Sequence, residues 1–327
     1  MEELLKVEDM HIFFHGEKGD VIPAVKGVNF HIHEGETLGL VGESGCGKSL
    51  TSLSIMQLIP KNDGFTEGKI LLDDIDVNVC SEKEMRAIRG NKMSMIFQEP
   101  MTSLNPVHKI GKQIGEVLLL HDVGDPKIIK VRTIEILKKV GIPRAEKIVD
   151  EYPHQLSGGM RQRVMIAMAM ACNPKLLIAD EPTTALDVTI QAQILDLMNT
   201  LQEEYKTAIL LITHDLGVIA EMADRVMVMY YGQIVEEADV RSLFKEPKHP
   251  YTLGLLHSVP TLEAEDEARL NPIHGTVPNL GDIQVGCPFR ARCERAFDKC
   301  KEENPPLFQM DNHSVRCWLY EGQGVSV

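Results

Sequence analysis

The stretch that decides the fold is Gly42-Glu43-Ser44-Gly45-Cys46-Gly47-Lys48-Ser49, which has the spacing of a phosphate-binding loop. Its glycines leave backbone N–H groups open to a phosphate. Lys48 supplies a charge for the β- and γ-phosphates, and Ser49 can ligate Mg²⁺. A short apolar strand at residues 37–41 and a helix at 50–58 flank the loop, as such a site requires. The predicted nucleotide contacts are Gly42, Ser44, Gly45, Cys46, Gly47, Lys48, Ser49 and Leu50.

The composition predicts a cytoplasmic α/β protein. The 327 residues, 43% of them hydrophobic, suffice for one large α/β domain plus a smaller one, or for two domains. A net charge of −14 argues against a surface that binds nucleic acid. We find no signal segment, and the longest nearly apolar run, residues 164–172, is far shorter than a membrane span. In the cytosol the seven cysteines are expected to stay reduced.

Two residues near predicted strand ends are candidates for nucleotide contacts. Residues 5–14 and 24–33 have strand patterns, and Phe14 could stack on an adenine or could be an ordinary core residue. Residues 68–72 predict another strand, residues 82–89 a charged helix, and residues 93–97 a short strand that ends at Gln98. Gln98, which precedes Glu99-Pro100, could touch Mg²⁺ or the attacking water, although an isolated Gln is usually a surface residue.

A helical insertion follows, from residue 110 to about 170. It closes with Ser157, Gly158 and Gly159, directly before an apolar helix at residues 164–171. Such a turn exposes N–H groups at the positive end of a helix and predicts a second anion site. A helix cap alone would explain the serine and one glycine but not the pair.

Three further strand or helix ends carry polar side chains. The buried strand at residues 175–181 ends in Asp180 and Glu181. The first acid can hold Mg²⁺ through water, and the second can orient or deprotonate the water that attacks the γ-phosphate. Ala185-Leu186-Asp187 opens the next helix, with Asp187 as a candidate cap. The strand at 208–213 ends at His214, which could bond the γ-phosphate or be a core histidine.

After a predicted hairpin of residues 226–230 and 233–237, the chain changes character near residue 245. A loop-like stretch, a short helix at 252–256 and an acidic run at 263–267 predict a linker and an appendage.

The appendage holds four clustered cysteines, Cys287, Cys293, Cys300 and Cys317. Clustered thiols in the cytosol often bind metal. Structural zinc favours closer pairs, whereas wider spacing suits a cuboidal iron–sulfur cluster, and chance clustering is the third alternative. Nearby cations could offset the charge of a cluster; they are Arg290, Arg292, Arg295, Lys299 and Arg316.

These motifs, taken in order, resemble those of the ATPase subunit of ABC transporters over about residues 4–245. The resemblance implies a P-loop NTPase (RecA-like) core, an antiparallel β subdomain and a helical subdomain at about 99–171, within a nucleotide-binding domain of residues 1–245. It also implies that two such domains enclose two ATP molecules head to tail, with Ser157 and Gly159 contacting the partner's ATP and Asp187 near the seam. Met160 departs from the glutamine of the general family pattern.

Residues 246–327 resemble the C-terminal region of ATPases in di- and oligopeptide importers. The matching motifs are His249-Pro250-Tyr251-Thr252 with Leu255-Leu256, Gly286 to Cys293, and Cys317-Trp318. The resemblance implies a [4Fe–4S] cluster on the four cysteines. It also implies a second related ATPase, two membrane permeases and an extracytoplasmic binding protein, with the chain on the inner face of the membrane.

We therefore expect an ATPase that energises import of di- or oligopeptides. Lys48 and Ser49 would hold phosphate and Mg²⁺, Asp180 would support the metal, Glu181 would activate water, and His214 with Gln98 would sense the γ-phosphate. One alternative is an importer ATPase for nickel or a small glycan. Another is a soluble ATPase of DNA repair or translation, which typically needs two fused domains, a coiled coil or a basic tail.

Overall fold

A computed structural model describes residues 2–16, 19–98, 103–121, 124–184, 186–258, 273–283 and 285–326. They fold into two compact units. The first unit comprises residues 1–5, 31–36 and 71–211, and the second comprises residues 6–30, 37–70 and 212–327. The predicted residues Glu99, Pro100 and Ala185, and the acidic run 263–267, lie outside the described residues.

The first unit is built on parallel strands that are buried along their whole length. β6 (Met93–Ile96), β7 (Leu176–Asp180) and β8 (Ala208–Thr213) are neighbours in that order. β6 and β7 are parallel, with Met93 opposite Leu176 and Ile96 opposite Ala179. Unbroken apolar runs are typical of strands covered on both faces, and the parallel register brings the carboxyl ends of β6 and β7 to one edge.

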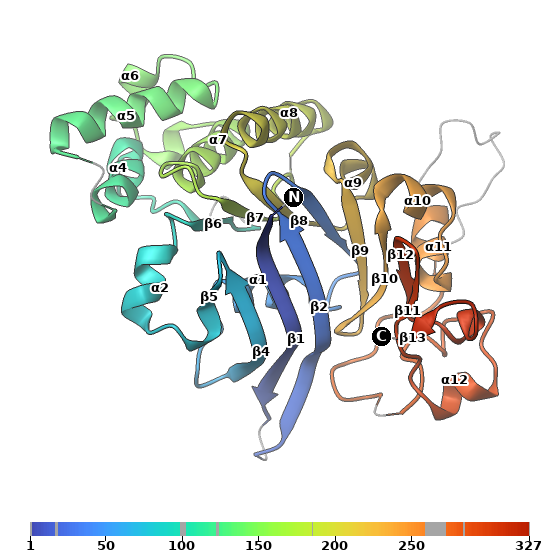
Figure 1. Ribbon diagram of the computed structural model, residues 1–327. Helices are drawn as coiled ribbons and strands as arrows, with labels where there is room; N and C mark the ends of the chain where they lie inside the picture. The colour runs from blue at the N-terminus through green and yellow to red at the C-terminus, as the bar shows by residue number, and fades with distance from the viewer. Residues whose placement is uncertain are drawn as a thin grey trace. The chain divides into compact units, whose positions relative to one another are not determined.

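The helical insertion begins at α4 (Ile110–Leu120), α5 (Pro126–Lys139) and α6 (Ala145–Ile148), which form one group in Figure 1. A 3₁₀ turn (Pro153–Gln155) leads to α7 (Gly158–Ala169), which packs on α4, α5, α8 (Val188–Tyr205) and β6. The expected insertion is thus present, as separate helices. The unit also contains β5 (Ile75–Asp76), a 3₁₀ turn (Val77–Val79) and α2 (Glu82–Ile88).

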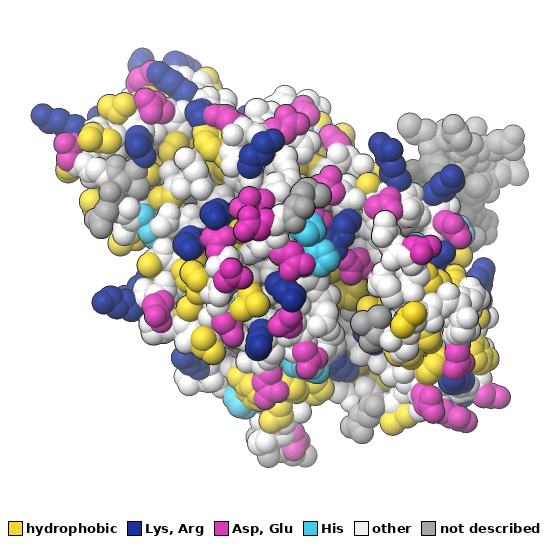
Figure 2. Space-filling view, viewed as in Figure 1, with side chains coloured by type: hydrophobic (Ala, Val, Ile, Leu, Met, Phe, Trp, Pro, Cys, Tyr) yellow, Lys and Arg dark blue, Asp and Glu magenta, His cyan; other side chains and the backbone are white. Residues whose placement is uncertain are grey.

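The second unit contains most of an antiparallel sheet in which β2 (Val21–His33), β1 (Glu3–His15) and β4 (Gly64–Leu72) are neighbours. Along β1, Leu5 and Val7 are buried, whereas Lys6 and Glu8 form an exposed ion pair of 2.8 Å. This alternation is the pattern of a strand with one solvated face. Acidic and basic side chains are interspersed on the face drawn in Figure 2.

The same unit contains β3 (Thr37–Val41), followed by the phosphate loop and α1 (Lys48–Ile55). β3 pairs in parallel with β9 (Arg225–Tyr230), which forms the predicted hairpin with β10 (Gln233–Asp239). Nearby helices are α9 (Leu216–Met222), α10 (Val240–Lys245) and α11 (Pro250–His257).

The C-terminal segment continues this sheet rather than forming the predicted appendage. β12 (His313–Val315) pairs antiparallel with β10, and β11 (Phe308–Met310) pairs with both β12 and β13 (Val325–Ser326). α12 (Asp298–Glu302) and a 3₁₀ turn (Trp318–Tyr320) complete it, with Cys300, Phe308 and Trp318 as its core. Short strands without an apolar run gave no signal in the sequence.

None of the helices in the described ranges has the length and apolarity needed to cross a bilayer.

Candidate functional site

The phosphate loop of the second unit has the backbone that its sequence predicts. Gly47 caps α1 with a φ of +113°, a conformation that favours glycine. A Cβ on Gly42 would lie 2.3 Å from the carbonyl oxygen of Met229. The loop therefore needs glycine for its own path and for close approach to β9.

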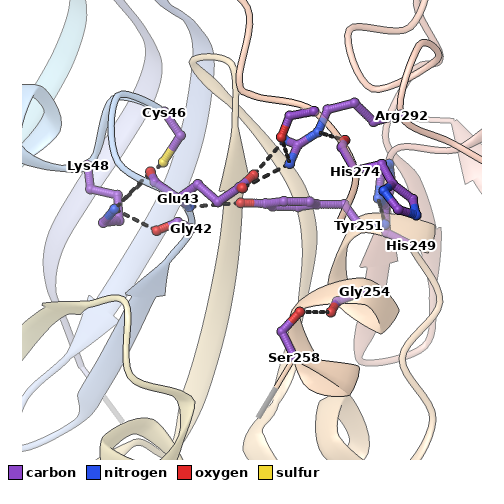
Figure 3. A network of polar contacts seen from close by, with 11 residues as sticks. Gly42, Glu43, Cys46, Lys48, His249, Tyr251, Gly254, Ser258, His274 and Arg292 are labelled. Atoms are coloured by element: carbon purple, nitrogen blue, oxygen red, sulfur yellow. Dashed lines mark hydrogen bonds and ion pairs between the residues drawn. The ribbon is translucent and has the colours of Figure 1, made fainter. Parts of the chain in front are cut away.

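Lys48 is buried at this loop and bonded within it. Its Nζ donates to the carbonyl oxygens of Gly42 at 2.7 Å and Glu43 at 3.1 Å (Figure 3). Lys48 as a whole is only 6% exposed. The ammonium is thus held among the loop carbonyls, where a phosphate oxygen could accept from it.

Cys46 lies inside the same loop, and its buried thiol is a structural group. Burial raises the pKa of this thiol. The backbone carbonyl oxygen of Cys46 accepts a 2.8 Å hydrogen bond from Gly232 N–H in the turn between β9 and β10. A protonated, covered thiol is a poor nucleophile.

Gln98 and Glu181, both predicted catalytic residues of the first unit, contact each other at the carboxyl ends of β6 and β7. Gln98 Nε2 donates to Glu181 Oε2 at 2.9 Å. Glu181 directly follows β7 in a left-handed conformation, with a φ of +48°. Asp180, the last residue of β7, is 4% exposed. The strand end therefore turns sharply, and its second carboxylate meets Gln98.

Sequence reasoning missed two side chains that hold this strand end. Thr184 Oγ1 donates to Glu181 Oε2 at 2.8 Å. The buried Gln162 of α7 donates from Nε2 to the carbonyl oxygen of Pro182 at 2.5 Å. Thr184 lies three residues after Glu181, a spacing from which this contact could have been found. Nothing in the sequence pairs Gln162 with residue 182.

The Ser157 turn is an exposed helix start, as predicted. Ser157 caps α7, with its Oγ accepting from Met160 N–H at 3.3 Å. Ser157 and Gly158 are exposed. Because a hydroxyl that accepts one bond can still donate its hydrogen, Ser157 can present a donor beside the N–H groups of the helix.

The remaining predicted residues lie as follows. Asp187 is exposed and caps α8, accepting from Ile190 N–H at 3.0 Å, which confirms the predicted cap. His214 is exposed in a bend directly after β8. Phe14 lies near the end of β1 and is partly buried beside Gly64. Ser44 and Gly45 lie in the phosphate loop, and Ser49 and Leu50 are in the first turn of α1. The nucleotide roles of these residues stay predictions.

The four clustered cysteines line one small cavity of about 10 Å³. Burial, together with the neighbouring thiols, raises the pKa of Cys287 to about 11 and that of Cys317 to about 12. Arg290 and Arg295 also line this cavity. Among the residues described, however, no group of three or more His, Cys, Asp or Glu side chains could hold a metal ion. The cysteines therefore share a cavity, but the structure does not make them a metal centre.

Comparison with known families gives two matches. The family described as "ABC transporter" matches residues 25–184. The family described as "Oligopeptide/dipeptide transporter, C-terminal region" matches residues 235–300.

Curated proteins match over nearly the whole chain. The oligopeptide transport ATP-binding protein AppD of Bacillus subtilis is 56% identical over 99% of both chains. The oligopeptide transport ATP-binding protein OppD of the same organism is 55% identical over 97% of this chain and 88% of that protein. Its dipeptide transport ATP-binding protein DppD is 50% identical over 98% of this chain and 96% of that protein.

Solved structures match about three quarters of the chain. The ATP-binding cassette MJ0796, solved as a dimer in a post-hydrolysis state with ADP and Pi, has a TM-score of 0.64 and 31% identity, covering 72% of this chain and 99% of that one. The Clostridium perfringens protein cbiO1, part of the ABC transporter complex cbiONQ, has a TM-score of 0.63 and 28% identity, covering 75% of this chain and 92% of that one.

Proposed function

The chain belongs to the ABC transporter family of ATP-binding proteins, and from this membership we propose that it hydrolyses ATP to energise import of di- and oligopeptides. The contact between Gln98 and Glu181 at the strand end carries the hydrolytic part of the proposal. The peptide cargo is supported by the names of the relatives and by the C-terminal family match.

The residues of the site fit MgATP. The phosphate loop leaves no room for a Cβ at Gly42 and holds a buried lysine, which is the chemistry of a triphosphate cradle. Family membership implies that Ser49, Asp180 and Gln98 would hold Mg²⁺, and each side chain carries an oxygen of the kind that Mg²⁺ prefers. When bound, Mg²⁺ neutralises charge on the β- and γ-phosphates.

In the proposed hydrolysis, Glu181 takes the proton of the attacking water. The water oxygen forms a bond to the γ-phosphorus while the bond to the bridging oxygen breaks and ADP leaves. Gln98 and Thr184 orient the carboxylate by their hydrogen bonds to Oε2. His214, which follows β8, would contact the γ-phosphate, and Phe14 would stack on the adenine.

The proposed partner proteins also follow from the family membership. Ser157, Gly158 and Gly159 would contact ATP held by a second, related ATPase, with Asp187 near the seam. The dimer would act on two membrane permeases fed by a binding protein, which places the chain on the inner face of the membrane. ATP at the seam would favour the closed dimer and ADP would not, so that binding energy becomes motion.

Glu181→Gln tests the hydrolytic role. The amide cannot accept the proton, so we expect the variant to bind ATP normally while turnover in the assembled transporter falls by about a hundredfold or more. Glu203→Gln, an exposed residue of α8, is the matched control. Unchanged turnover in the Glu181 variant would remove this residue from the mechanism. Peptide-stimulated ATPase activity with the permeases and binding protein tests the cargo.

As a second part of the proposal, we propose a [4Fe–4S] cluster in the cavity that the four cysteines share; its binding would have to draw together side chains that do not converge on one metal ion in the structure. Cys287, Cys293, Cys300 and Cys317 would ligate it, and Arg290 and Arg295 on the cavity wall would offset its charge. Zinc has less support, because it needs four ligands at ~2.3 Å from one ion. The irons of a cubane sit at separate corners and accept more widely spaced thiolates. The default role is structural, because a small core gains stability from such a link.

Anaerobic purification tests the cluster. We expect a brown protein with absorption near ~400 nm and about four irons per chain. Cys300→Ser should lower the iron content, whereas Cys172→Ser, outside the cavity, should not. Zinc without iron would replace the cluster proposal with its alternative.

A further inference from the structure

The C-terminal segment contacts the phosphate loop through an arginine. Arg292 donates from its two terminal nitrogens to both carboxylate oxygens of Glu43, at 2.6 and 2.9 Å (Figure 3). The Arg292 side chain is 5% exposed and that of Glu43 31% exposed. A two-pronged, mostly covered pair of this kind fixes geometry as well as charge. Glu43 is the second residue of the loop, directly after Gly42.

A second contact holds the backbone of the same residue. Glu43 N–H donates to the hydroxyl oxygen of Tyr251 at 2.8 Å. Tyr251 belongs to α11 and is fully buried, with its ring against those of Tyr230 and Phe289. Both ends of Glu43 are thus held by residues from beyond the predicted ATPase core.

Glu43 is also bonded to the lysine of the loop. Its carbonyl oxygen accepts from Lys48 Nζ at 3.1 Å. A continuous chain of contacts therefore runs from Arg292 through Glu43 to Lys48. Movement of Glu43 would move an acceptor of the group that binds the phosphates.

Arg292 itself is held in place by the stretch between Cys287 and Cys293, the first two of the four clustered cysteines. It directly precedes Cys293, and its backbone N–H donates to the carbonyl oxygen of Phe289 at 2.9 Å. Its Nε donates to the carbonyl oxygen of His274 at 2.9 Å. The stretch between Cys287 and Cys293 thus sets where the guanidinium lies.

We propose that Arg292 is a positioning residue for ATP binding. Arg292 holds the phosphate loop through Glu43, so the geometry of the loop depends on the fold of the four-cysteine segment, residues 287–317. It acts in two ways. It fixes the Glu43 backbone beside Lys48, and it neutralises a carboxylate that would otherwise repel the triphosphate. The inference rests on the proposed function, because it takes ATP as the ligand of the loop.

The test measures ATP affinity in the full chain, where hydrolysis is not needed. Arg292→Gln should weaken ATP binding about tenfold, because Glu43 is left unpaired. The double variant Arg292→Gln with Glu43→Gln should recover most of this loss, since the repelling charge is gone. Arg292→Lys, which keeps the charge but not the fork, should lie between. Tyr251→Phe should weaken binding a fewfold.

Lys301→Gln is the matched control, because its ion pair with Asp298 is exposed to solvent in the same segment. Its ATP affinity should equal that of the wild type. Equal affinity for Arg292→Gln and wild type would overturn the inference, as would additive losses in the double variant. If Arg292→Gln fails to fold, Tyr251→Phe and Arg292→Lys provide the test. Wild-type ATP affinity in both of these variants would overturn the inference. If the wild type itself bound no ATP, the proposed function would fail instead.

Discussion

His249 is a buried histidine that caps a helix without carrying a charge. Its Nδ1 accepts from Tyr251 N–H at 3.0 Å at the start of α11. The residue is 2% exposed, and burial lowers its pKa to about 4, with Arg316 acting in the same direction and Glu236 against it. Neutral imidazole is therefore the state that the fold requires.

This residue predicts a pH dependence of folding stability. In the unfolded chain the histidine has a pKa of about 6.5, so the unfolded state binds more protons between that value and the folded pKa. The contribution is complete above about pH 6.5 and falls as the pH drops toward about 4, by about 3 kcal/mol in all. We expect the free energy of unfolding in urea to fall between pH 7 and pH 5.

His249→Asn is the comparison, because asparagine keeps a cap acceptor and does not titrate. Its unfolding free energy should change less over the same range. Glu236 has its own acid dependence. Burial raises the pKa of Glu236, but hydrogen bonds with His313 and with the backbone N–H groups of Lys248 and His249 outweigh burial, and the pKa is lowered. The stability that ionised Glu236 contributes is therefore lost at a lower pH. If the unfolding free energies of the wild type and of His249→Asn had identical slopes against pH between 7 and 5, this would contradict the role of His249.

At the scale of elements, the start of α7 offers two neighbouring glycines with different surroundings. A Cβ on Gly158 would have no heavy atom within 4 Å, whereas one on Gly159 would lie 2.8 Å from Ile190 Cγ2 of α8. Substituting each glycine in turn therefore distinguishes the effect of packing within the chain from the effect of contact with a partner's ATP.

Gly159→Ala should therefore destabilise the isolated chain by about 1–3 kcal/mol, because α8 must shift. Gly158→Ala should leave unfolding stability unchanged or slightly higher. In the assembled transporter, both should reduce ATP turnover if this turn touches the partner's nucleotide. Urea unfolding and turnover of the two variants give the comparison, and equal stability losses would contradict the packing argument.

Elements whose chemistry is local were predictable from the sequence. The phosphate loop, the end of β7 at Asp180 and the cap at Asp187 each carry their signal within a few residues. The contact between Gln98 and Glu181 follows from two strands that end at one edge. The pairing of β12 with β10 and the contact of Arg292 with Glu43 join residues far apart in sequence, and no local pattern selects such partners.

At the scale of the molecule, the proposed head-to-tail dimer would divide each ATP site between two chains. Its phosphate loop lies in the second unit, and its Ser157 turn is exposed on the first. A related cassette has been solved as a dimer. If the turn completes a site on a partner, the phosphate loop of one chain can bind ATP but lacks the donors that stabilise the transition state.

The isolated chain should accordingly bind ATP and hydrolyse it slowly, with turnover per chain rising with protein concentration or on addition of the second ATPase. Ser157→Arg should keep ATP binding and lose this rise, because the larger side chain blocks the turn. Thr200→Arg, exposed on α8, controls for added charge. Steady-state ATPase assays over a dilution series, with sedimentation to follow dimers, supply the measurement. Full turnover at concentrations where only monomers sediment would show that each chain holds a complete site.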